Sequence, residues 1–418
     1  MKKIVAFICD AMGQAMNCVA IAQKLAEKQV ETIFIADQSF QGFFDSYGFK
    51  EHLLDYHGLG AEAQMAQTWS DHVERGVSIF QKPTIDQIET YIAPYWGEIV
   101  DGAISADRRF QTALEYVKPD LVVIDDVIVY PSVVLSRIPW VRVVSCNPLE
   151  MPDRAAPPAL SGYTQYETEN WEAFLTRYLT AVSPHHEKLN AYLSSRGIDP
   201  LEEGVFAPVS PHLNFLIYPE AIKYQRLEKL PPNTYYMNAC IRQEKLFELP
   251  FAKDRPVAYI GSGSMAPSEA GVMCSWIAAL VDNGFRILAS IGTGEGFNIE
   301  NTEDVHLGEF LPQPTVIPQV DVVIHHGGNN TFNEVLFFGK PQVVLPFAWD
   351  GYDNAQRVED LGIGRRLPRY AVKPKELAEA ATALVEDPEI AGKLQRISED
   401  MRKNPGVDLA ASKIEAFL

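Results

Sequence analysis

Short apolar runs alternate with segments of helical periodicity in the first part of the chain. Ile4–Cys9 is an unbroken apolar run of strand length, and behind it Val19, Ala22 and Ala26 recur at helical spacing. Buried strands that alternate with helices predict a parallel, doubly wound α/β sheet. The same reasoning predicts further strands at 32–36, 121–124 and 140–145, and helical stretches at 85–117 (interrupted at Pro94) and 171–197.

The alternation pauses and then starts again in the second half. Between 231 and 255 the pattern gives way to Pro, Asn and mixed charge, after which strands are predicted at 257–260, 286–290, 305–307, 320–324 and 342–345. We therefore expect a first domain at 1–235, a second at 236–400, and a last helix at 401–418 that could pack back on the first domain. Two such domains would place the carboxyl ends of their strands beside a cleft, where ligands bind in open α/β sheets.

Composition narrows the classes of partner. The 418 residues are 47% hydrophobic and carry 36 basic against 55 acidic side chains, which gives a net charge of −19. That sign repels phosphate backbones, so nucleic acid is not expected as a partner. The 5 cysteines form no C-x-x-C pair, and no apolar run reaches the length of about 18 residues that a membrane span needs. We expect a protein of the reducing cytoplasm without a metal site or a membrane span.

A motif that follows the strand predicted at 320–324 carries most of the chemical information. His325 and His326 are followed by Gly327 and Gly328, and a helix is predicted to open near Asn330. Unpaired backbone N–H groups at a helix N-terminus, approached over glycines, form a site for a diphosphate, to which a histidine can add a donor. A structural alternative exists for the residues that follow, because T-x-x-E, formed by Thr331 and Glu334, also fits a capping box that would serve only the start of the helix.

The wider segment resembles a known signature. H-H-G-G-N-N-T-x-x-E, then G-x-P and P-x-x-x-D-x-x-x-N-A, is similar to the nucleotide-sugar motif of family 1 glycosyltransferases of the bacterial natural-product type. The resemblance implies the GT-B fold, two doubly wound Rossmann-like domains facing each other across a cleft, with the acceptor bound by the N-terminal domain and the nucleotide sugar by the C-terminal domain. It also implies inverting transfer of a sugar from a UDP- or TDP-sugar to a small organic acceptor, without a metal or other cofactor.

The resemblance assigns roles to individual donor-site residues. Phe310 would stack on the base, and Leu311 would offer backbone groups to its edge. Gln313 and Glu334 would meet the ribose, and Asp350 would bind hydroxyls of the transferred sugar. The residues implied to hold the two phosphates are Ser264, His326, Gly328, Asn330 and Thr331. Each assignment agrees with simple chemistry, since carboxylates accept from hydroxyls while N–H and O–H donors meet phosphate oxygens.

The chain departs from the family pattern at two positions. Gly351 stands where the family has Gln, which removes one expected contact to the sugar. Gln14 stands where the family has the histidine that deprotonates the acceptor, and an amide is no base. Asp125 aligns with the aspartate that would orient that histidine.

Three explanations of the missing base stay open. Asp10 or Asp125 could deprotonate the acceptor directly, although Asp10 could instead cap the first helix. A histidine from elsewhere, such as His57 or His72, could reach in. The acceptor could also be acidic enough, for example a phenol, to need little help.

Two other functions fit parts of the pattern. The absence of the usual histidine allows a nucleotide-sugar-binding protein without transfer activity, and the same fold allows a UDP-sugar epimerase. G-S-G-S-M-A at 261–266 fits a dinucleotide fingerprint, but the next predicted strand ends at Ser290 rather than at the acid that NAD binding requires. A dehydrogenase is therefore disfavoured, while the acceptor, the sugar and the oligomeric state stay open.

Overall fold

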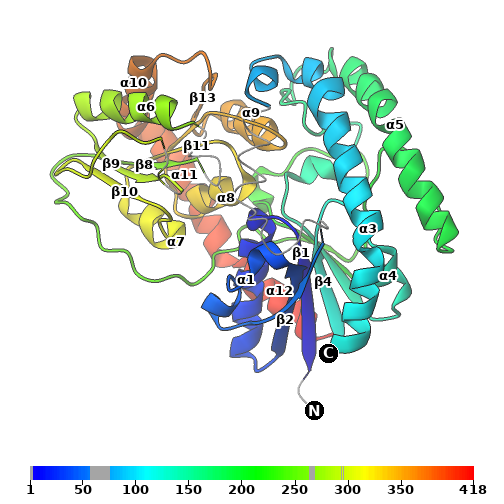
Figure 1. Ribbon diagram of the computed structural model, residues 1–418. Helices are drawn as coiled ribbons and strands as arrows, with labels where there is room; N and C mark the ends of the chain where they lie inside the picture. The colour runs from blue at the N-terminus through cyan, green and yellow to red at the C-terminus, as the bar shows by residue number, and fades with distance from the viewer. Residues whose placement is uncertain (1–2, 57–75, 263–268, 293, 295) are drawn as a thin grey trace.

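The protein consists of two parallel sheets flanked by helices (Figure 1). The computed structural model describes residues 3–56, 76–262, 269–292, 294 and 296–418. The first sheet has the order β3-β2-β1-β4-β5-β6-β7 and the second the order β10-β9-β8-β11-β12-β13, and the strand pairings in both are parallel. The prediction of two doubly wound α/β domains is confirmed.

The elements of the first domain begin and end as follows: β1 (Ile4–Cys9), α1 (Met12–Glu27), β2 (Glu31–Asp37), β3 (Lys50–Leu54), α3 (Ala93–Val117), β4 (Leu121–Asp125), α4 (Pro131–Leu135), β5 (Trp140–Val144), α5 (Trp171–Ser195), β6 (Leu213–Leu216) and β7 (Thr234–Tyr236). The second contains β8 (Val257–Gly261), α6 (Ala270–Asp282), β9 (Arg286–Ser290), β10 (Val305–Gly308), α7 (Gln313–Val316), β11 (Val322–His325), α8 (Asn329–Phe337), β12 (Gln342–Val344), α9 (Gly351–Leu361), β13 (Arg365–Arg366), α10 (Pro374–Val385), α11 (Pro388–Lys403) and α12 (Gly406–Glu415).

In each sheet the strand order reverses beside the first strand of the domain, which is β1 in the first sheet and β8 in the second. In the first sheet β1 lies between β2 and β4, and Cys9 is paired with Asp125, so the next residues, Asp10 and Asp126, leave neighbouring strand ends together. In the second sheet His325 at the end of β11 is paired with Gly261 at the end of β8. These are the positions at which open α/β sheets bind ligands.

The structure adds strands that the hydrophobic pattern did not predict. β3 has the sequence KEHLL and no fully buried residue, and β13 has only two residues, both arginine. β7 is half-buried throughout and extends to Tyr236, past the boundary expected at 235. Strands at the edge of a sheet bury less than central strands and therefore lack a continuous apolar run.

The end of the chain returns to the first domain. α11 continues to Lys403, so the last helix, α12, begins at Gly406 rather than at 401, after a break at Asn404 and Pro405. Ala410, Ala411 and Ile414 of α12 are fully buried in the core that α1 and the first sheet share. Figure 1 shows α12 beside α1, with both termini at the same end of the first domain.

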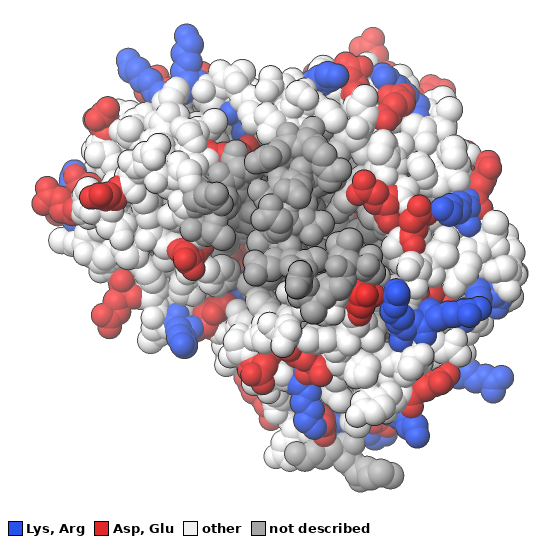
Figure 2. Space-filling view, in the orientation of Figure 1, with Lys and Arg blue, Asp and Glu red and all other residues white. Residues whose placement is uncertain are grey.

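Charged side chains cover the surface in a mixed pattern. Figure 2 shows acidic and basic residues interspersed over one face of the molecule. Such a mixture is typical of a solvated surface rather than of a basic track for a nucleic-acid backbone. Within the described ranges, none of the helices combines the length and the apolar character that crossing a membrane requires.

We expect the docking of α12 to depend on the glycine at its start. A Cβ atom at Gly406 would overlap the carbonyl oxygen of Met237 and lie 2.9 Å from that of Ala239, both backbone atoms of the segment that follows β7. Gly406→Ala should lower the free energy of unfolding by about 1 to 3 kcal/mol or more, the usual cost of overpacking a filled site.

Gly271→Ala provides the matched control for that substitution. Gly271 lies in α6, and none of the described atoms comes within 4 Å of the place that a Cβ atom there would take. Alanine should therefore be neutral or stabilising by up to about 1 kcal/mol. Denaturant titration of both variants measures the difference. Equal stability of the two variants would show that α12 does not need this close approach.

Candidate active site

The loop between β11 and α8 forms an open helix N-terminus. Gly328 is the residue before the helix, and among the described residues no side chain caps the first turn of α8. Thr331 and Glu334 lie inside the helix, so the capping-box explanation of this pair is wrong. Gly327 has a φ of 93°, and a Cβ atom at Gly328 would lie 2.5 Å from Nε2 of His326. Gly327 is therefore required by the loop, whereas a side chain at Gly328 would displace the ring of His326; the backbone N–H groups of the loop can bind an anion.

Two neutral histidines stand at this loop. Nδ1 of His325 accepts from the backbone N–H of Gly327 at 3.1 Å, so Nε2 carries the proton and donates to Oε1 of Gln342 at 2.8 Å. Burial lowers the pKa of His325 to about 3. Burial also lowers the pKa of His326 to about 4, and the nearby guanidinium of Arg369 acts in the same direction. His325 is thus a structural residue, whereas His326 is a neutral imidazole over the glycine loop.

A second group of polar residues lies behind the first turns of α7 and α8. Thr331 donates its hydroxyl to Oε1 of Gln313 at 3.0 Å, so this pair is already formed without a ligand. Oε1 of the buried Glu334 accepts from Nη1 of Arg242 at 2.8 Å, while Oε2 has no hydrogen-bond partner among the described residues. Arg242 was not predicted, because it lies in the segment after β7, where the periodicity lapses. The free carboxylate oxygen is an acceptor suited to a hydroxyl.

The residues expected to contact the nucleotide base differ in which of their groups are accessible. The side chain of Phe310 is 56% exposed, so its ring is accessible for stacking. Leu311 is buried, and its N–H donates to Oγ of Ser290 at 3.3 Å, which uses that backbone donor within the domain. Ser264 lies outside the described residues, as do His57 and His72.

Asp350 and Gly351 contact protein atoms on both sides of the cleft. Oδ2 of Asp350 accepts from the backbone N–H of Asn147 in the first domain at 2.8 Å, and burial raises the pKa of this carboxyl to about 7. A Cβ atom at Gly351 would lie 2.9 Å from the carbonyl oxygen of His326. The backbone of Gly351 therefore packs on the donor loop, which leaves no room for the glutamine of the family pattern without a shift of that loop.

Gln14 caps α1. Its Oε1 accepts from the backbone N–H groups of Asp10 and Ala11, each at 2.9 Å. A glutamine in the first turn that reaches back to the residues before the helix satisfies donors that would otherwise lack partners. The residue at the position of the family's base is thus structural in this chain.

Asp125 is directed into the protein. It is 1% exposed, and its Oδ1 accepts from Oγ of Ser145 at 2.5 Å. Burial raises its pKa well above the ordinary range of a carboxyl. The structure therefore places this predicted residue in the core at the end of β4, where it is paired with Cys9 and bonded to Ser145.

Asp126, which the sequence motifs did not single out, leaves the strand end next to the one that carries Asp10. Its Oδ2 accepts from the hydroxyl of Tyr130 at 2.5 Å, and that hydroxyl lies 2.7 Å from the hydroxyl of Tyr56. Burial and the charge of Asp10 raise the pKa of Asp126 to about 7. The doublet Asp125–Asp126 at a strand end was the available signal, but only the strand register decides which member leaves the sheet beside Asp10.

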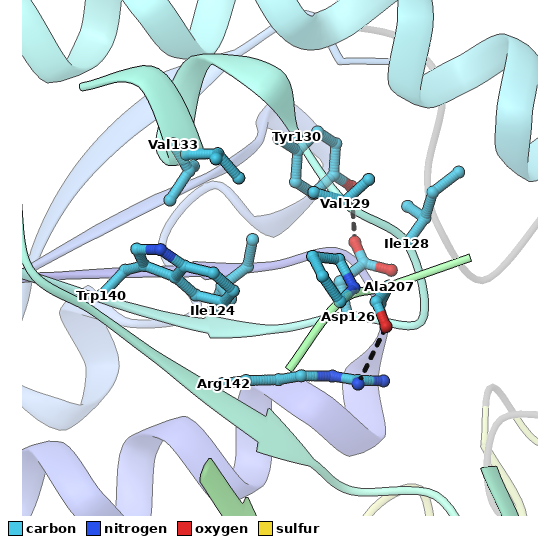
Figure 3. Close-up of a pocket in the computed structure, with 11 residues that line it drawn as sticks. Ile124, Asp126, Ile128, Val129, Tyr130, Val133, Trp140, Arg142 and Ala207 are labelled. Carbon is cyan, nitrogen blue, oxygen red and sulfur yellow. Dashed lines mark hydrogen bonds between the residues drawn. The ribbon is translucent and has the colours of Figure 1, made fainter. Parts of the chain in front are cut away.

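A small cavity adjoins this carboxyl. Figure 3 shows Asp126 and Tyr130 joined by a hydrogen bond, and Arg142 bonded to the carbonyl of Ala207 on the opposite wall. The cavity has a volume of about 10 Å³, close to the minimum that one water needs. It is therefore too small to hold an organic acceptor.

Comparison with known proteins identifies the kind of enzyme to which this arrangement belongs. Residues 276–417 match the family model described as "Erythromycin biosynthesis protein CIII-like, C-terminal domain". The chain is 26% identical over 416 residues to the NDP-glycosyltransferase YjiC of Bacillus subtilis, covering 98% of this chain and 95% of the relative. It is 27% identical over 311 residues to the oleandomycin glycosyltransferase of Streptomyces antibioticus, covering 72% of this chain and 68% of the relative.

Solved structures agree in fold over the whole length. The glycosyltransferase of kitacinnamycin superposes with a TM-score of 0.72 at 19% identity and covers 100% of this chain and 99% of its own. SsfS6 of Streptomyces sp. SF2575, solved with thymidine diphosphate, superposes with a TM-score of 0.66 at 18% identity, with 99% of each chain covered. The chain therefore has the GT-B fold, and the relatives to which it is similar over most of its length are glycosyltransferases. In this glycosyltransferase the two parallel sheets are the two GT-B domains, and the loop between β11 and α8 faces the first domain.

The packing of Gly351 on the donor loop makes a testable prediction. In Gly351→Ala the new methyl group would lie too close to the carbonyl oxygen of His326. That oxygen is a backbone atom, so the loop that carries it must shift. We expect the displaced loop to bind UDP and TDP about 10-fold or more weakly, equivalent to about 1.4 kcal/mol.

Gly13→Ala is the control for that measurement, since a Cβ atom there would make an ordinary contact at 3.7 Å. Isothermal titration with both nucleotides compares the two variants. Undiminished affinity in a folded Gly351→Ala protein would contradict a role of this contact in shaping the nucleotide site.

Proposed function

We propose that this glycosyltransferase moves a sugar from a UDP- or TDP-sugar to a small organic acceptor of acidic character, with inversion at the anomeric carbon. One observation carries the proposal. The first turn of α8, which presents the glycine loop, is hydrogen-bonded to the first turns of α1, which follow Asp10. An anion-binding helix N-terminus and a carboxylate loop are thereby held against each other across the cleft, as transfer between a bound donor and a bound acceptor requires.

The donor half uses preorganised positive dipoles. When the bond between sugar and diphosphate breaks, negative charge develops on the leaving phosphate, which the free N–H groups of α8 can stabilise. Burial lowers the pKa of His326, so at pH 7 it is a neutral imidazole whose single N–H can donate to a phosphate oxygen. These donors would take the place of a metal ion.

The acceptor half uses two carboxyl groups. Asp10 and Asp126 leave neighbouring strand ends, and the pKa of Asp126 is raised to about 7 by burial and by the charge of Asp10. A carboxyl with a pKa of about 7 is a stronger base than an ordinary carboxylate with a pKa of about 3.9. We assign the base to Asp10 with Asp126 beside it, and expect an acceptor whose reacting group is acidic, such as a phenol.

Two further features support the choice of substrates and compartment. The free Oε2 of Glu334 fits a sugar hydroxyl of the nucleoside, and the exposed ring of Phe310 fits a planar base. Relatives solved with thymidine diphosphate support TDP as one of the two nucleotides. The five cysteines are all unpaired thiols, as expected of a protein that works in the cytoplasm.

The donor half predicts the behaviour of one variant. His326→Ala should weaken binding of UDP or TDP and lower turnover by about 100-fold or more, the usual loss when one donor to a developing charge is removed. His185→Ala, on α5, is the control and should bind and turn over normally. A folded His326→Ala protein with normal binding and rate would remove the assignment. Nucleotide binding by the wild-type protein without any turnover would instead identify a donor-binding protein.

The acceptor half predicts a pH profile. Asp126 takes up a proton as the pH decreases through about 7, which removes negative charge beside the proposed base, so the kcat/KM of the wild-type enzyme should fall over that range. Asp126→Asn removes the carboxyl whose pKa is about 7 and should therefore move the acidic limb to lower pH. Asp10→Asn should lose transfer.

Asp125→Asn serves as the comparison, because its carboxyl bonds to Ser145 and should leave the position of the limb unchanged. Rates measured across the neutral range with a phenolic acceptor distinguish these outcomes. Full activity of Asp10→Asn together with loss in Asp125→Asn would reverse the assignment, and efficient transfer to a simple alcohol would count against an acidic acceptor.

A further inference from the structure

We infer that Asn17 and Asn330 are positioning residues that set the acceptor loop in register with the donor loop. Nδ2 of Asn17 donates to Oδ1 of Asn330 at 2.7 Å. Nδ2 of Asn330 in turn donates to the backbone carbonyl of Gly13, also at 2.7 Å. Both ends of the Asn330 amide are therefore engaged by α1. This inference rests on the proposed function, since it concerns how the two halves of that site meet.

The contact revises the role that the family resemblance implied for Asn330. An amide whose oxygen accepts from Asn17 and whose nitrogen donates to Gly13 is directed at the first domain rather than at a diphosphate. Asn17 is 2% exposed, so its amide is held in place by its surroundings. The phosphate-binding groups that remain in the loop are the backbone N–H groups and His326.

The Asn17–Asn330 pair lies where it can fix the position of the acceptor loop relative to the donor loop. Gly13 and Asn17 lie in the first two turns of α1, directly after Asp10. Asn330 lies in the first turn of α8, directly after the glycine loop. Over the described part of the chain, these are the two side-chain hydrogen bonds that join α1 to α8. Other bridges reach different elements: Asn329, for example, donates to the carbonyls of Ser145 and Ile217 at 2.8 Å each.

The relative position of the acceptor and donor loops should affect the rate of sugar transfer rather than the affinity for the nucleotide. In-line attack requires the reacting atoms to approach within about 3 to 3.5 Å, and a displacement of about 1 Å can cost about 100-fold in rate. The base and the diphosphate loop belong to different domains, so the contacts between those domains set this distance. Asn17 bonds to the helix behind the donor loop through Asn330, so its loss should leave nucleotide binding nearly intact.

The test uses substitutions that preserve size. Asn17→Asp replaces a donor by a carboxylate that faces the oxygen of Asn330, and should lower kcat by about 10-fold or more while the KM of the nucleotide sugar and the affinity for UDP and TDP change less than about 2-fold. Asn330→Asp keeps the acceptor for Asn17 but loses the bond to Gly13, and should act in the same direction. In the double variant the losses should be non-additive, as for two members of one unit.

Asn190→Asp is the control, because Asn190 bonds to the backbone of Leu201 within the first domain and should keep its kcat. The inference is overturned if Asn17→Asp keeps its kcat, or if Asn330→Asp loses nucleotide affinity while Asn17→Asp has no effect, since Asn330 would then contact the phosphates directly.

A second measurement does not depend on turnover. Hydrogen exchange of the nucleotide-free protein should become faster in the first turns of both α1 and α8 in Asn17→Asp, and should stay at the wild-type rate in Asn190→Asp. If the wild-type enzyme transfers no sugar, the proposed function fails, yet this exchange experiment still decides whether the pair holds the two loops together. Unchanged exchange at both turns would overturn the inference.

Discussion

The docking of the α8 N-terminus on the first domain is the constraint on which the site depends. Strand ends leave backbone carbonyls that must be paired if they are buried. The amide of Asn329 binds the carbonyls of Ser145 and Ile217, and Asn333 donates to that of Ile217 at 3.0 Å. Side chains of the second domain thus complete the hydrogen bonding of the first sheet, so the cleft is a polar junction between two backbones.

The same junction continues along α9. Asp353 accepts from the backbone N–H groups of Leu160 and Gly162 at 2.7 and 2.8 Å, and Arg357 donates to the carbonyl of Ile222 at 2.7 Å. A helix that begins at Gly351, beside the donor loop, is in this way attached to the acceptor domain over several turns. Asp350 lies at its start, so the residue expected to hold the transferred sugar is also part of the attachment.

Burial of these groups gives the site its acid–base character. Asp126, Asp350 and Asp353 each have a pKa raised to about 7, while those of His325 and His326 are lowered to about 3 and 4. The raised carboxyls favour folding at acidic pH, and this contribution is lost as the pH rises through about 7. The histidines act oppositely, because the unfolded state takes up their protons as the pH falls below about 6.5. The cleft therefore holds neutral donors and proton-sharing carboxyls near neutral pH.

The sequence by itself determined most of the central strands and the anion-binding loop, but not β6 (Leu213–Leu216), while the tertiary structure decided which side chains face the chemistry. β1 and β9 have the predicted bounds because a buried strand requires a continuous apolar run, and Gly327 marks the loop because its backbone conformation favours glycine. Edge strands such as β3 gave no such signal. The choice of Asp126 over Asp125 follows from strand register, and the bond between Asn17 and Asn330 joins residues 313 positions apart. Local patterns record which backbone a segment adopts, but the pairing of distant polar groups depends on how two separately folded sheets meet.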